Sequence, residues 1–129
     1  MVKKVLVCVD GLCATDEGVL LVRRRLMPFM GFWGLPGGIL EHNESLEDAC
    51  KREFKEETGY NIIVNEILGA RIEEHPNQTR VIIIFDVKIK DGKLLKSEEH
   101  SEIGFYKKPP GKMIIDYFKL IPKTSKKAD

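Results

Sequence analysis

A short acidic helix is the feature that most constrains what this 129-residue chain can fold into. Ser45 is a typical N-cap residue, and Gly59 is well placed to end a helix in the left-handed conformation. The sequence therefore predicts a helix over Leu46–Thr58. A helix of this kind buries its apolar face against the rest of the fold, so the residues on that face indicate which side chains lie in the interior.

The inward face of this predicted helix carries glutamates. On a helical wheel with about 100° per residue, the apolar stripe is centred on Leu46. Glu53 and Glu57 fall within about 20° of that centre, and Glu56 lies at the edge of the stripe. A buried carboxylate without a partner is costly enough to take up a proton instead. We therefore interpret the three glutamates as ligands of a divalent cation such as Mg²⁺, which prefers hard oxygen ligands.

A pair of glycines, Gly37 and Gly38, precedes the acidic helix. Glycine lets the backbone adopt positive φ and approach a ligand closely, and such a turn can direct carbonyl oxygens toward a metal. Taken together with the acidic helix, the pair favours a site that holds a metal and a phosphate.

These residues match a known motif. The segment 38–60 resembles the Nudix box at every fixed position, and the flanking LPGG is present as residues 35–38. The fixed residues are Gly38, Glu44, Arg52, Glu53, Glu56, Glu57 and Gly59. The resemblance implies an α/β fold, the Nudix-type α/β/α sandwich with a mixed β-sheet between helices. It also implies that residues 1–129 form a single Nudix hydrolase domain.

The resemblance further implies an enzyme that cleaves the pyrophosphate linkage of a nucleoside diphosphate joined to another moiety, with Mg²⁺ or Mn²⁺ as cofactor. Carried over by position, Glu53 and Glu57 would be the principal metal ligands. Glu56 would be a further ligand or the group that activates water, and Gly38 would offer its carbonyl oxygen. The remaining box residues, Glu44, Arg52 and Gly59, would be structural, with Arg52 orienting the acids by ion pairing.

Many Nudix relatives add an acid from a loop after the sheet, as base or ligand. In this chain the candidate loop is residues 96–102, where we favour Glu99, then Glu98, then Glu102. The alternative is that these are solvated loop charges. The three histidines, His42, His75 and His100, are expected at the surface.

The substrate is less constrained by the sequence. Pro76 lies 16 residues beyond Tyr60, where relatives that resemble ADP-ribose pyrophosphatases carry a proline, although HPN is also a typical turn. ADP-ribose or a related nucleotide sugar is therefore the first expectation. The alternatives are clean-up of nucleoside triphosphates, hydrolysis of dinucleoside polyphosphates, and a non-catalytic nucleotide-sensing module on the same fold. Phe32 or Trp33 could stack on a base, but core packing is the expected role for both.

Arginines and the glycine turn are the candidates for phosphate contacts, because a guanidinium binds phosphate in bidentate fashion. The candidate substrate-binding residues are Arg23, Arg25, Arg80 and Gly37. In a strand, Arg23 and Arg25 share one face and Arg24 faces the other way, so at most part of the RRR run serves the site.

The remaining elements follow from local patterns. Strands are predicted at residues 2–9, 18–24, 61–72, 81–90 and 103–106, with a bulge at Gly69. A closing helix is predicted at residues 113–120, and a polar tail at about residues 123–129.

Composition excludes several partners. The net charge is +1, so no broad field for nucleic acid or anionic membranes is expected, and an RNA-processing pyrophosphohydrolase, which needs a basic groove, is disfavoured. The three cysteines are expected to be free thiols, and the chain has no apolar run long enough to span a membrane. We expect a cytoplasmic protein acting on a small molecule, with a homodimer possible by analogy with small relatives.

Overall fold

The computed structural model describes residues 3–122, and the predicted tail at 123–129 lies outside this range. The elements follow one another along the chain in the order β1 (Lys4–Leu12), β2 (Ala14–Thr15), β3 (Gly18–Arg24), β4 (Trp33–Gly34), β5 (Gly37–Ile39), α1 (Leu46–Thr58), β6 (Tyr60–His75), β7 (Gln78–Gly92), β8 (His100–Tyr106) and the 3₁₀ turn η1 (Tyr117–Leu120). The predicted α/β class with a mixed sheet is confirmed.

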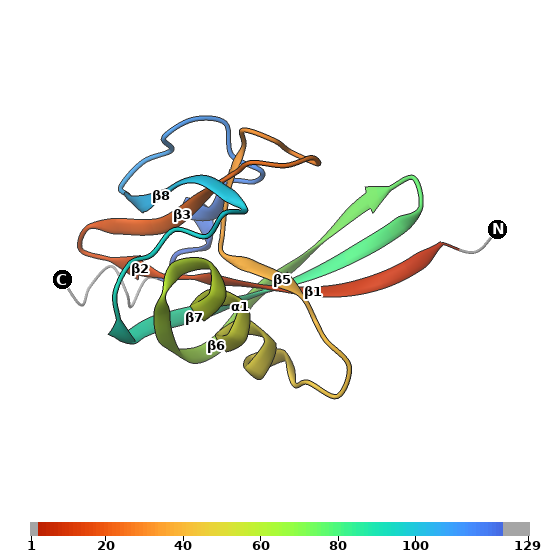
Figure 1. The fold of residues 1–129 in the computed structure, drawn as a ribbon, viewed down its shortest axis with the longest axis horizontal. Helices are drawn as coiled ribbons and strands as arrows, with labels where there is room; N and C mark the ends of the chain where they lie inside the picture. Colours follow the sequence, from red (N-terminus) through yellow and green to blue (C-terminus); the bar gives the residue numbers. More distant parts are fainter. Residues whose placement is uncertain (1–2, 123–129) are drawn as a thin grey trace.

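The main sheet has the strand order β5-β1-β7-β6, in which β1 and β7 run parallel and the other neighbours antiparallel. The long β6–β7 hairpin and the start of β1 extend together away from the body of the molecule (Figure 1). The register of β6 against β7 shifts next to Gly69, which confirms the predicted bulge. The second sheet is built on β3, which pairs with β2, β4 and β8.

The helix α1 is confirmed over the predicted residues. The Ser45 side chain accepts a hydrogen bond from the Asp48 N–H at 3.0 Å, and Gly59 ends the helix with φ 86°. The helix packs against β1, β5 and β6, with Phe54 fully buried. Its orientation is therefore the one that the apolar stripe predicts.

The core lies on both faces of β1 and β7. Because strand side chains alternate, Ile82 and Ile84 pack in one apolar cluster with residues of β3 and η1, whereas Phe85 and Val87 pack in the other, under α1. This arrangement explains why β7 begins as an unbroken apolar run. Both of its faces are covered.

The prediction of a helix at residues 113–120 is wrong. The Trp33 N–H donates to the Lys112 carbonyl oxygen, and the Ile114 N–H donates to the Trp33 carbonyl oxygen. This pairing keeps the chain extended beside β4 up to Ile114, so only the short turn η1 remains for a helical conformation. Within residues 3–122, no helix has the length and hydropathy that a membrane span requires.

Candidate active site

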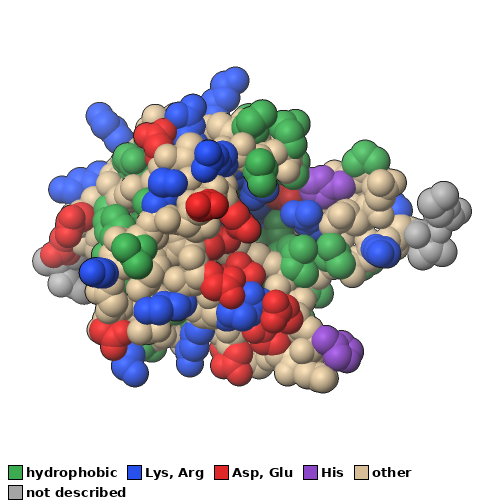
Figure 2. Space-filling view, viewed as in Figure 1, with side chains coloured by type: hydrophobic (Ala, Val, Ile, Leu, Met, Phe, Trp, Pro, Cys, Tyr) green, Lys and Arg blue, Asp and Glu red, His purple; other side chains and the backbone are tan. Residues whose placement is uncertain are grey.

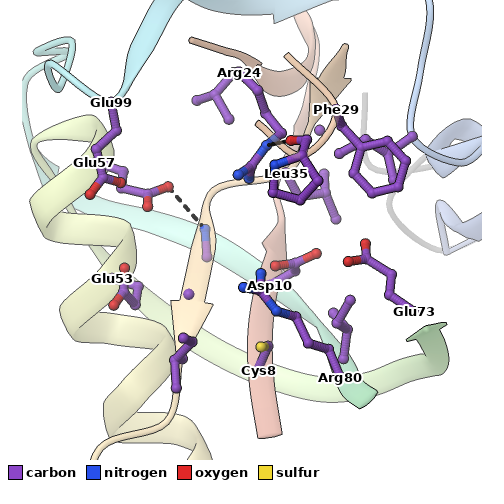
Figure 3. A pocket seen from close by; sticks show the side chains of 18 of the residues that line it. Cys8, Asp10, Arg24, Phe29, Leu35, Glu53, Glu57, Glu73, Arg80 and Glu99 are labelled. Atoms are coloured by element: carbon purple, nitrogen blue, oxygen red, sulfur yellow. Dashed lines mark hydrogen bonds between the residues drawn. The ribbon is translucent and has the colours of Figure 1, made fainter. Parts of the chain in front are cut away.

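A pocket of about 570 Å³ opens between α1, β1, the β6–β7 hairpin and the start of β8. In the space-filling view, acidic side chains gather at the middle of this face, next to a hollow (Figure 2). The close view separates two walls: Glu53, Glu57 and Glu99 lie on the side of α1, whereas Arg80 and Glu73 lie on the opposite side (Figure 3). Asp10 lies between the two walls.

Glu57 is the most deeply placed acid of the predicted set, with 5% of its surface exposed. Its Oε1 accepts a hydrogen bond from the Gly37 N–H at 3.1 Å. The pKa of the Glu57 carboxyl is raised to about 9, mainly by burial; the hydrogen bond from Gly37 opposes this rise, and the nearby Glu53 and Glu99 carboxylates contribute to it. A positive charge delivered to this position would therefore be strongly favoured.

Glu53 lies on the same wall, one helical turn before Glu57. Its Oε1 accepts a hydrogen bond from Arg52 Nη1 at 2.7 Å, and burial raises the pKa of the carboxyl. Gly38 stands directly against this carboxylate, because a Cβ at position 38 would overlap it. The structure thus brings the predicted Gly38 backbone and the predicted acids together.

Arg52 connects the helix to the loop before it. The guanidinium donates to both Glu44 carboxylate oxygens, from Nε at 2.7 Å and from Nη2 at 3.0 Å, and Nη2 also donates to the Ile39 carbonyl oxygen. The hydrogen bond from Arg52 lowers the pKa of the Glu44 carboxyl. This geometry fits the structural role that the motif assigns to both residues.

Glu56 is placed differently from its two neighbours on the helix. Its side chain is 59% exposed, and its Oε2 lies 3.6 Å from Arg52 Nη1. Glu56 is not among the residues that line the pocket. Its predicted part in metal binding stays a prediction.

Among the three loop acids, Glu99 is the one that lines the pocket. Glu102 instead binds Arg23 at 2.8 Å, and the Glu98 carbonyl oxygen accepts from Arg25 Nη1. This placement favours Glu99, as the order of candidates did.

The surface position expected for His100 is wrong. His100 is 5% exposed, and its Nε2 lies 3.8 Å from Glu57 Oε1. Burial lowers the pKa of the imidazole to about 4, and the Arg24 and Lys96 charges act in the same direction. A histidine at the start of a strand gives no local signal of burial, because the packing that covers it comes from β3 and α1.

Only one of the arginines that the sequence predicts for substrate binding lines the pocket. Arg80 lines it as expected, together with Arg24 and Arg71. Arg23 and Arg25 do not line it, so this placement gives no support to their predicted substrate contacts. Strand alternation had placed Arg24 on the opposite face from its neighbours, but only the fold shows that the pocket lies on that face.

Several residues that line the pocket belong to no motif in the sequence. Burial raises the pKa of Asp10 to about 7, against the effect of the Arg71 guanidinium. Arg71 Nη1 binds Glu73 Oε2 at 2.6 Å. The fully buried Tyr117 hydroxyl has no hydrogen-bond partner in residues 3–122. Asp10 has one detectable signal in the sequence, as the charge that directly follows the apolar run at residues 5–9.

The two aromatic candidates for base stacking lie elsewhere. Phe32 and Trp33 line a second hollow of about 750 Å³ on the other side of β3, and Trp33 is 4% exposed within the core. Trp33 also packs edge-on against Tyr106, with ring centroids 4.9 Å apart. The expected packing role fits Trp33.

Known proteins resemble this chain in the segment that contains the acidic helix and most of the pocket. The family description "NUDIX domain" matches residues 4–109. The chain is 35% identical to an ADP-ribose pyrophosphatase of Methanocaldococcus jannaschii, over 78% of this chain and 60% of that protein. It is 29% identical to an 8-oxo-dGTP diphosphatase of Proteus vulgaris, over 79% of this chain and 92% of that protein.

Solved structures agree on the fold. The crystal structure of a MutT protein from Methanosarcina mazei superimposes with a TM-score of 0.74 and 30% identity, covering 81% of this chain and 78% of that one. The match to the domain description spans well over half of the sequence and includes the complete acidic helix. The chain belongs to the Nudix family.

Proposed function

We propose that this chain is a hydrolase that uses a divalent metal to cleave the phosphoanhydride bond of a nucleoside diphosphate derivative. The observation that carries the proposal is the inward position of Glu53 and Glu57 on α1, where Glu57 is buried with one backbone N–H as its hydrogen-bond donor. Two carboxylates at such a site, with Glu99 beside them, are compensated best by a cation.

The donor set of this wall fits Mg²⁺ or Mn²⁺. Glu53 and Glu57 would hold the ion, with the Gly38 carbonyl oxygen and Glu56 as further candidates. When bound, such an ion neutralises phosphate charge and lowers the pKa of its water ligand. The exposed Glu99 carboxylate is suited to accept the proton of an attacking water, because it lines the pocket and remains open to solvent.

The arginines of the pocket suit the phosphates of the substrate. Arg24, Arg71 and Arg80 line the pocket, and a guanidinium binds phosphate oxygens in bidentate fashion. Arg24 uses its Nε on the Pro28 carbonyl oxygen, and Arg80 uses its Nε on Gln78 Oε1. Within residues 3–122 the terminal nitrogens of both form no hydrogen bond and remain as donors for a ligand, so the pocket offers arginines for a diphosphate as well as acids for a metal.

ADP-ribose or a related nucleotide sugar is our first candidate substrate, because the Methanocaldococcus relative carries the name ADP-ribose pyrophosphatase. Pro76 no longer adds support, since it lies in the β6–β7 turn and does not line the pocket. A nucleoside triphosphate is the second candidate, supported by the Proteus relative named 8-oxo-dGTP diphosphatase.

A substrate panel tests the proposal. The purified chain is assayed with Mg²⁺ on ADP-ribose, nucleoside triphosphates, dinucleoside polyphosphates and nucleotide sugars. We expect hydrolysis of at least one compound, and a loss of kcat of at least about 100-fold in Glu57→Gln. Glu47→Gln is the matched control, because Glu47 is an exposed acid on the same helix.

Two results would contradict the proposal. One is a Glu57→Gln variant that turns over as fast as the parent chain. The other is tight binding of a nucleotide with no cleavage of any compound under any of the metals tried, which is the behaviour of a sensing module.

A further inference from the structure

The outer edge of β6 is regular near the hairpin turn. β6 is the last strand of the main sheet, and no strand pairs with its outer side within residues 3–122. Its register against β7 shifts three times between Asn61 and Gly69, whereas residues 69–75 pair with β7 without a shift. Bulges make an edge a poor template for another strand, whereas a regular edge leaves N–H and C=O groups available to one. Residues 70–75 therefore offer an edge to which a strand can be added.

An apolar row crosses the sheet and ends at this edge. Val7, Val81 and Ile72 lie opposite one another on β1, β7 and β6. Strand alternation places them on the face that α1 covers further along, where Val9 and Ile83 pack in the apolar cluster under the helix. Ile72 is 64% exposed, whereas Val7 and Val81 are half-buried. The row is therefore least covered at its outer end.

The charges on the other face of this edge are self-complementary. Arg71 and Glu73 flank Ile72 in the sequence and line the pocket, where Arg71 Nη1 binds Glu73 Oε2 at 2.6 Å. When two copies of the edge are set antiparallel about a twofold axis at Ile72, each Arg71 lies opposite the Glu73 of the other copy. With the axis at Arg71 or at Glu73, like charges lie opposite each other instead. Opposite charges across a strand pair are favourable and like charges unfavourable, so the first arrangement is selected.

We propose that this chain forms a homodimer in which the β6 edges of two copies, residues 70–75, pair antiparallel about Ile72. The exposed Ile72 side chain is covered by Ile72 of the second copy, and the apolar row continues into the second sheet. The Arg71–Glu73 pair becomes part of a network of four charges. Because both residues also line the pocket, the interface adjoins the pockets of both copies.

The shape of the molecule permits this arrangement. The β6–β7 hairpin extends away from the body of the molecule (Figure 1). β6 runs from the end of α1 toward the tip of the hairpin. Antiparallel pairing therefore places the two bodies at opposite ends of the joined sheet, where they do not compete for space.

Sedimentation of the full chain over a range of micromolar concentrations tests the inference. We expect a species of twice the 14.7 kDa of one chain. In Ile72→Lys the dissociation constant of the dimer should rise by at least about 10-fold, because the substitution places two positive charges at the twofold axis. Ile63→Lys is the matched control, since Ile63 is an isoleucine of the same strand, 49% exposed, that lies outside the paired segment.

Charge reversal identifies the register. Glu73→Arg and Arg71→Glu should each be monomeric, because positions 71 and 73 then carry the same charge and repel those of an identical copy. A mixture of the two variants should form a heterodimer, detected by native mass spectrometry, since one variant is positive at both positions and the other is negative. Circular dichroism checks that each variant is folded.

A disulfide test serves if a charged variant does not fold. The three native cysteines are buried, so a cysteine introduced at the surface reacts without competition from them. In Ile72→Cys the two thiols meet at the twofold axis, where directly opposite residues of paired strands are close enough for a disulfide. We expect a covalent dimer on mild oxidation of Ile72→Cys and none for Ile63→Cys.

Three results would overturn the inference. The first is a native chain that stays monomeric at every concentration. The second is a dimer that Ile72→Lys does not weaken, or that Ile72→Cys does not cross-link, because its interface would lie elsewhere. The third is a mixture of folded charge variants that forms no heterodimer. None of these results bears on hydrolysis, so the dimer and the proposed function fail separately.

Discussion

The buried carboxyl of Glu57 makes the stability of the metal-free protein depend on pH. Its pKa is about 9 in the folded chain, against an ordinary value of 4.5. The folded state therefore binds this proton more tightly than the unfolded state, and the associated stability is present at low pH and lost as the pH rises from about 4.5 toward 9.

We predict that the free energy of unfolding of the chelator-treated protein falls between about pH 5 and pH 9, and that Glu57→Gln flattens this dependence. At pH 8 the variant should have a higher free energy of unfolding than the parent, by about 1–3 kcal/mol, because folding of the parent requires Glu57 to take up a proton that the unfolded chain has released, whereas the neutral amide requires none. Urea unfolding across this pH range measures both quantities. Identical pH profiles for the two proteins would show that Glu57 is not the group that titrates.

The two glycines before the helix differ in what a side chain would meet. A Cβ at Gly38 would overlap the end of the flexible Glu53 side chain, whereas a Cβ at Gly37 would overlap the Val9 carbonyl oxygen, which is fixed backbone. The same substitution should therefore act on function at one position and on stability at the other.

We predict that Gly38→Ala displaces the Glu53 carboxylate and lowers Mg²⁺ affinity by at least about 10-fold with a stability change below about 1 kcal/mol. Gly37→Ala should destabilise the fold by about 1–3 kcal/mol. Calorimetry and urea unfolding separate the two effects. The account of these positions is wrong if Gly38→Ala binds metal normally.

At the scale of the element, α1 is the platform for the acids, and its caps secure its ends. The Ser45 side chain satisfies the Asp48 N–H at the first turn, and neither residue lines the pocket. We predict that Ser45→Ala lowers the free energy of unfolding by about 1 kcal/mol and leaves kcat within about twofold. Urea unfolding and the hydrolysis assay check the two halves. A large loss of kcat would mean that the cap also positions the acids.

This helix and its buried face could be predicted from the sequence because caps and periodicity are local signals. It failed at residues 113–120, where pairing with Trp33 keeps the chain extended, and such pairing has no local signature. The ends of β6 and β7 were also not predicted, because both strands continue into the hairpin beyond the predicted residues. Tertiary pairing overrides propensity at these places.

At the scale of the whole molecule, the site is assembled from segments far apart in the chain. Asp10, Arg71, His100 and Tyr117 meet in one pocket, although none belongs to the acidic motif. The motif residues were predictable because they occupy one helix and the turn before it. The others could not be predicted, because their positions depend on which faces of β1, β6 and β8, and which side of η1, the fold turns toward the pocket.

The overall charge also has a testable consequence. Basic and acidic side chains are interspersed over the face in Figure 2, and the net charge is +1. We predict no measurable binding of single-stranded RNA at about 0.15 M salt, because few phosphates would be neutralised together. Fluorescence anisotropy with a labelled RNA checks this. Binding that weakens steeply with salt would point instead to a basic groove.

The position of a bound cation bears most directly on the whole account. Crystals grown with Mn²⁺ and measured at a wavelength where manganese scatters anomalously would locate the ion independently of the protein coordinates. We predict an anomalous peak about 2.1 Å from carboxylate oxygens of both Glu53 and Glu57. A map with no peak at these carboxylates, or with manganese bound only to acids outside the pocket, would contradict the claim that the inward acids of α1 exist to hold a metal.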